Sequence, residues 1–132
     1  MAWPDAVALT IAYLTPIAAP AQVASRAPEQ AAPRDPLVQV RRVGGSTLLV
    51  RDVARLDVFA WAPTEAEAWP LALTVRSAMW ALNGTTLLGP TCYRVEEFLS
   101  PRQFDDPASG TPRVWATYEL ALRADEAIRP AS

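Results

Sequence analysis

The sequence predicts an α+β fold, an antiparallel sheet of about four main strands with two helices packed on one face. Three observations lead to this prediction. Apolar and polar side chains alternate over residues 55–61, as in a half-buried strand. The apolar spacing becomes helical over residues 68–82. The links between the later strands are short, which favours antiparallel pairing.

Length and composition indicate one globular domain over residues 1–132. The chain is 51% hydrophobic and 20% charged, which is typical of a protein with its own core. A net charge of −2 argues against broad attraction to nucleic acid or to an anionic membrane. The apolar stretch 1–24 lacks a basic start and is broken by prolines, so we expect neither a secretory signal nor a membrane span, and a protein made in the cytosol.

The first third of the chain predicts one helix and one strand. Asp5 is a good N-cap for a helix over residues 6–15, which Pro16 and Pro20 would end. A long Pro/Ala-rich loop, 16–36, follows, in which residues 22–26 are a weak candidate for a strand at a sheet edge. Residues 37–43 alternate as a strand, and Gly44-Gly45 is expected to end it as a turn. Residues 48–50 form either a brief strand or an extended link.

The second helix begins after the central strand. Thr64 and Glu67 have the spacing of a capping box, and Asn83-Gly84 is a suitable C-terminal stop. Pro70 falls inside this pattern, where it removes a backbone hydrogen bond. Either the helix bends there, or residues 64–69 form a separate short turn.

The last third predicts two strands, 91–99 and 113–123, separated by a Pro/Asp-rich loop over residues 100–112. Residues 124–132 are expected to be a frayed tail. The single cysteine, Cys92, has no partner for an internal disulfide and is predicted to be a small buried hydrophobe.

The sheet face away from the helices mixes aromatic side chains with charges of both signs. A face of charges suits solvent, but large aromatics among them are typical of a protein interface. We therefore favour a partner-binding face over a simply solvated one. Its predicted members are Gln39, Arg41, Arg55, Asp57, Phe59, Trp61, Arg94, Glu96, Trp115 and Glu119.

No catalytic, cofactor-binding or metal-binding motif is found in the sequence. There is no histidine to act as a general base near neutral pH, and no glycine-rich phosphate loop. Glu96 and Glu97 are neighbours on a strand, so they point to opposite faces. Asp105-Asp106 lies in a loop and is interpreted as turn chemistry, with a calcium site as the weaker alternative. We expect no cofactor and no enzymatic activity.

Five segments together resemble the tail terminator proteins of long-tailed, non-contractile (siphovirus-type) bacteriophages. They are residues 40–45 (VRRVGG), 54–62 (ARLDVFAWA), 64–67 (TEAE), 93–97 (YRVEE) and 112–120 (PRVWATYEL). Their order and spacing, which span nearly the whole chain, carry the resemblance. Pro70 and the proline-rich segment 16–36 depart from the pattern.

The resemblance implies a structural virion protein that forms a hexameric ring at the head-proximal end of the tail tube. Such a ring ends tube polymerisation and joins the tail to the head. Its partners would be further copies of itself, the tail tube protein and a head-side connector or stopper protein. DNA would pass through the lumen without specific binding. The protein would assemble in the host cytoplasm and reside in the virion tail, with no membrane contact.

From the face assignment, and not from the resemblance, we hypothesise which residues meet a neighbouring subunit or the tube. They are Arg41, Arg55, Asp57, Phe59, Trp61, Glu96, Phe104, Asp105, Asp106 and Trp115. The charged members would form ion pairs across subunits.

Three other functions compete with this one. A head-completion (connector) or tail-tube protein of the same machine is the nearest, although the predicted helix content is high for a tube protein. A small monomeric α+β binding domain is the second. An enzyme that uses carboxylates is the third and the least supported.

Overall fold

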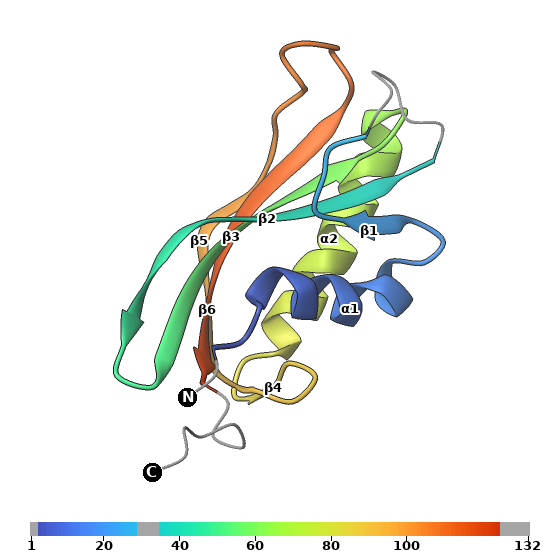
Figure 1. The fold of residues 1–132 in the computed structure, drawn as a ribbon. Helices are drawn as coiled ribbons and strands as arrows, with labels where there is room; N and C mark the ends of the chain where they lie inside the picture. The colour runs from blue at the N-terminus through green and yellow to red at the C-terminus, as the bar shows by residue number, and fades with distance from the viewer. Residues whose placement is uncertain (1–2, 29–34, 125–132) are drawn as a thin grey trace.

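The computed structural model describes residues 3–28 and 35–124 (Figure 1). The helices and strands are, in order, α1 (Ala6–Ala18), β1 (Gln22–Ala24), β2 (Leu37–Leu48), β3 (Arg51–Trp61), α2 (Glu65–Ala81), β4 (Thr85–Thr86), β5 (Thr91–Gln103) and β6 (Arg113–Arg123). Both helices lie on the same face of one curled sheet (Figure 1). Among the described residues, no helix is both long and apolar enough to cross a membrane.

The sheet has six strands in the order β1-β2-β3-β6-β5-β4, so the predicted antiparallel sheet of about four main strands is wrong. It is also mixed, because β1 pairs with β2 in parallel while the other pairs are antiparallel. β1, which is three residues long, confirms the weak candidate at residues 22–26 for a strand at a sheet edge, and β4, which was not predicted, is two residues long. Strands this short leave no alternating pattern in a sequence.

The turn expected at Gly44-Gly45 is wrong as well. β2 continues through both glycines to Leu48, and the hairpin turns at Leu49 and Val50. A bulge directly precedes the glycines, since the β2–β3 register shifts between Arg42 and Gly44. Gly45 has a φ of +122°, and a Cβ placed on it would lie 1.9 Å from the Val53 carbonyl oxygen. Glycine is therefore required here for close strand approach and not for a chain reversal.

Both predicted helix starts are confirmed. The Asp5 side chain accepts a hydrogen bond from the Ala8 amide, and the Thr64 hydroxyl accepts one from the Glu67 amide. α1 continues past Pro16 to Ala18, because a proline in the last turn removes only one helical hydrogen bond. Pro70 lies inside α2, which is a single helix and not a short turn followed by a helix.

The main core lies between the helices and the inner face of the sheet, which is the face they cover. Val38, Val40, Leu56 and Val58 point to this side, as the predicted alternation required. Met79 of α2 and Leu14 of α1 are completely buried, as is Cys92, which confirms its predicted role. An ion pair between Arg76 Nε and Glu97 Oε1, at 2.7 Å, joins α2 to β5. Glu97 and Glu96 do face opposite sides, because Glu96 lies opposite Glu119 on the uncovered side.

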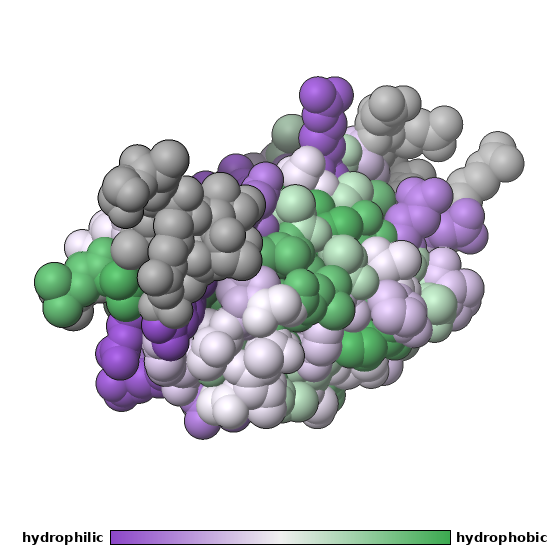
Figure 2. All heavy atoms as spheres, turned by 60° about the horizontal axis from the view of Figure 1, so that its bottom comes forward, coloured by the Kyte–Doolittle hydropathy of each residue, from purple (hydrophilic) through white to green (hydrophobic). Residues whose placement is uncertain are grey.

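α1 is mostly apolar and contains no charged residue. Four of its side chains are only partly buried against the core, namely Val7, Leu9, Ile11 and Tyr13. Figure 2 brings the lower end of Figure 1 forward and shows apolar residues reaching the surface as a patch. The Tyr13 hydroxyl donates a 2.8 Å hydrogen bond to the Ala78 carbonyl, which ties α1 to α2.

The loops differ from their predicted bounds. β5 extends to Gln103, so the Pro/Asp-rich loop begins at Phe104 and not at residue 100. β5 also contains register shifts at three places, Cys92/Arg94, Glu97/Leu99 and Leu99/Arg102. The predicted loop 16–36 contains the end of α1 and all of β1, and residues 29–34 lie outside the described residues. Residues 125–132 of the predicted tail also lie outside them.

The close strand approach at Gly45 makes a testable prediction. Gly45→Ala should lower the free energy of unfolding by about 2 to 4 kcal/mol, because the new methyl group meets a backbone carbonyl in a left-handed conformation. Gly110→Ala is the matched control, since Gly110 also has a positive φ but nothing lies within 4 Å of its Cβ position. It should cost about 1 to 2 kcal/mol. Urea unfolding of both variants checks this, and equal losses would contradict the close-approach argument.

Candidate functional site

The outer face is the side of the sheet away from the helices. The structure places seven of the predicted site residues on it, as their alternation required. Its central register sets Phe59 opposite Trp115, and Trp61 opposite Arg113. Gln39 of β2 lies opposite Phe59 on the other side. The seven are Arg41, Arg55, Asp57, Phe59, Trp61, Glu96 and Trp115.

The aromatic side chains of the outer face form a second, smaller core. Phe59 stacks on Trp115 with ring centroids 5.3 Å apart, and Phe104 meets Trp115 edge-on at 5.2 Å. Phe59 and Trp61 are only 3% and 5% exposed. The sequence analysis expected them to be open to a partner, and they are not. Trp115 is half-buried, and Phe104 is 41% exposed.

Arginine side chains cover these rings. The guanidinium carbons of Arg41 and Arg113 lie 5.2 Å and 4.7 Å from the centroid of Phe59. Arg113 also lies 4.9 Å from Trp61, and Arg102 lies 4.3 Å from Trp115. A guanidinium over an aromatic ring is attracted by the electron-rich face of the ring while its nitrogens stay hydrated. The outer face is therefore a layer of aromatics beneath a layer of cations.

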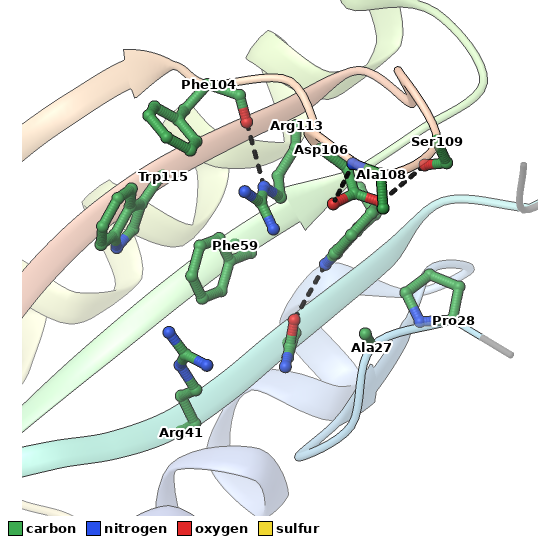
Figure 3. Close-up of a pocket in the computed structure, with 12 residues that line it drawn as sticks. Ala27, Pro28, Arg41, Phe59, Phe104, Asp106, Ala108, Ser109, Arg113 and Trp115 are labelled. Atoms are coloured by element: carbon green, nitrogen blue, oxygen red, sulfur yellow. Dashed lines mark hydrogen bonds between the residues drawn. The ribbon is translucent and has the colours of Figure 1, made fainter. Parts of the chain in front are cut away.

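A hollow of about 640 Å³ opens on this face (Figure 3). Phe59 and Trp61 line it together with Gln39, whose Oε1 accepts a 3.0 Å hydrogen bond from Trp61 Nε1. Ala27 and Pro28, which follow β1, lie on one side of it in Figure 3. The loop that follows β5 lies on the other side. The remaining lining residues are Arg41, Phe104, Asp106, Ala108, Ser109, Arg113 and Trp115.

The loop side of the hollow is held by hydrogen bonds. Asp106 accepts one from the Ser109 hydroxyl at 2.6 Å and a longer one from the Ala108 amide. These bonds, that of Ser109 first, lower the pKa of the Asp106 carboxyl. Asp105 accepts a hydrogen bond from Gln103 Nε2. Both aspartates thus make loop contacts, as their interpretation as turn residues required, and the described residues contain no group of three or more side chains suited to a metal ion.

The charged residues have partners within the subunit. Arg55 pairs with Glu119 at 2.5 Å, and Arg94 pairs with Glu96. Asp57 is buried, accepts a 2.8 Å hydrogen bond from the Thr117 hydroxyl, and lies 3.5 Å from Arg41. Any ion pair across subunits would therefore exchange or share an existing partner.

The sequence analysis missed four contributors to this site. Arg113 could have been found, because β6 in register with β3 sets it opposite Trp61. Arg102 could not have been found, because two register shifts near the end of β5 decide to which face its side chain points. Ala27 and Pro28 reach the hollow only because β1 pairs in parallel with β2, for which the sequence carries no signal.

The loop makes a second prediction. Ser109→Ala should raise the pKa of Asp106 toward its ordinary value, because the strongest hydrogen bond to the ionised carboxylate is lost. An NMR titration of the Asp106 carboxyl carbon below pH 5 measures this. Ser100→Ala is the control, since Ser100 donates to Glu97 and not to this loop. An unchanged Asp106 titration in Ser109→Ala would contradict the assignment.

Comparison with known proteins supplies a family. No curated protein matches the chain in a sequence comparison. A family model described as phage tail termination protein matches residues 2–128, which includes every helix and strand. This agrees with the resemblance drawn from the five sequence segments. The chain belongs to the phage tail termination protein family.

Proposed function

We propose that this protein forms a ring, of six subunits by resemblance, that caps the head-proximal end of a phage tail tube. The ring ends tube polymerisation and joins the tail to the head connector. Membership of the tail termination family over residues 2–128 is the observation that carries the proposal. The protein acts as a structural part of the virion tail and has no enzymatic activity, which suits a chain without histidine.

We assign one side of the subunit contact to the outer face. In a ring the contacts are heterologous, so this face meets a different surface of the next copy or of the tube. Arg41, Trp115 and Phe104 supply exposed or half-exposed contact area, and arginine and aromatic side chains are the types enriched at interfaces. Phe59 and Trp61 contribute from beneath, because they hold the arginines in place.

The rest of the predicted contact set extends the same surface. Arg55 and Glu96 occupy the half of the outer face beyond the aromatic cluster, and Arg55 lies 4.0 Å over the half-exposed ring of Phe98. Asp105 and Asp106 present the loop after β5. A net charge of −2 suits a lumen through which DNA passes without being held.

The hollow supports a second candidate function, that of a monomeric domain that binds a small ligand. Its volume of about 640 Å³ lies within the range of ligand pockets. Oligomeric state separates the two candidates. Light scattering during chromatography and negative-stain images should reveal rings, or caps on tail tubes when tubes are added. A subunit that stays monomeric in the presence of tubes would overturn the ring.

Charge reversal on the outer face tests the contact assignment. Arg41→Glu should weaken ring or cap formation at least about tenfold, because it places a carboxylate beside Asp57 and removes the cation over Phe59. Ser77→Glu adds the same carboxylate at an exposed position of α2 and should leave assembly unchanged. Circular dichroism confirms that both variants fold. Equal assembly by the two variants would show that the outer face is not the contact.

A further inference from the structure

The hollow on the outer face contains two guanidinium groups, neither of which has an ion pair shorter than 3.5 Å among the described residues. Arg41 and Arg113 lie over the same Phe59 ring. Burial lowers the pKa of Arg113, the negative charge of Asp106 opposes this effect, and the positive charge of Arg41 adds to it. Arg113 Nε donates to the Phe104 carbonyl at 3.0 Å. Within residues 3–28 and 35–124, no carboxylate lies within ion-pair distance of Arg113, and Arg41 has only the 3.5 Å contact to Asp57.

A further polar atom at this site has no partner. The indole Nε1 of Trp115 is buried, and no acceptor among the described residues reaches it. A buried donor without an acceptor costs free energy. Trp115 lines the hollow together with Arg41 and Arg113, so two cations and aromatic carbon meet there.

We infer that the hollow binds a carboxylate side chain on an extended peptide segment of a partner protein, with an apolar neighbour on the same segment. The carboxylate would lie between Arg41 and Arg113, and paired guanidinium groups form short, charge-assisted bonds to such an anion. The apolar side chain would lie against Phe59, Trp61 and Trp115. That the partner is a subunit or tail component rests on the proposed function.

The lining favours a peptide over the phosphates of DNA. Asp106 lines the same hollow, and Asp105 adjoins it. A continuous run of phosphates would extend along this negative side, whereas a single carboxylate between Arg41 and Arg113 meets less of it. The chain's net charge of −2 gives no general attraction for a polyanion.

NMR titration with a short peptide tests the inference. The probe is a blocked hexapeptide with an aspartate followed by a leucine at its centre, compared with the same peptide carrying asparagine. The aspartate peptide should give saturable shifts of the Arg41 and Arg113 Nε–H signals and of the Trp115 indole signal. The asparagine peptide should bind about tenfold more weakly, because hydrogen bonds to a charged acceptor are the stronger ones.

Two variants and one control sharpen the test. Arg41→Gln should weaken binding about tenfold, and Arg113→Lys, which keeps the charge over the rings but removes the planar fork, should weaken it too. Arg94→Gln lies on the same face outside the hollow, so it should change nothing. Equal binding of both peptides, no saturable shift at millimolar peptide, or shifts at these residues with duplex DNA alone would each overturn the inference.

The same samples distinguish this inference from the proposed function. If the subunit forms rings but does not bind the peptide, the carboxylate site is wrong and the proposed ring stands. If the subunit binds the peptide saturably but never forms rings or caps, the carboxylate site is supported and the proposed ring is wrong.

Discussion

The double burial of β3 is the constraint on which the rest of this structure depends. The consecutive residues Leu56 to Ala62 are all buried, although successive side chains point to opposite faces of the sheet. The helices cover one face, as in most domains of this class. Among the described residues, no second layer of secondary structure covers the other face, and aromatic rings, arginine side chains and the loop after β5 cover it instead. The outer face owes its unusual composition to this need.

The outer face is neither a bare apolar patch nor a simple charged surface. A subunit with Phe59 and Trp61 uncovered would carry a contiguous apolar area of the kind that promotes aggregation. Arginines lying over the rings cover the apolar carbon with hydrated charge. In the proposed function, this would let the subunit remain separate until it meets its assembly.

Much of the fold follows from local patterns, and what does not follow has identifiable causes. The caps at Asp5 and Thr64, and the alternation of β2, β3 and β6, could be predicted because each depends on neighbours within a few residues. The parallel pairing of β1 and the course of β5 could not be predicted. They depend on pairing over long sequence distances and on bulges, which change the face of every later residue. Likewise the sequence placed Phe59 on the correct face, but its burial required knowing that Arg113 lies beside it.

The irregularity of β5 has a consequence for the life of the unassembled subunit. β5 pairs with β6 along one edge. Along its other edge it pairs only with β4, at Thr91 and Cys92, and no other described strand lies there. A long, straight strand in that position would offer a template on which identical chains stack without limit. Three shifts of register interrupt its ladder, so successive amides do not present the even repeat that fibril growth requires. Subunits that accumulate before tails are ready would thus be protected against amyloid-like stacking along this strand.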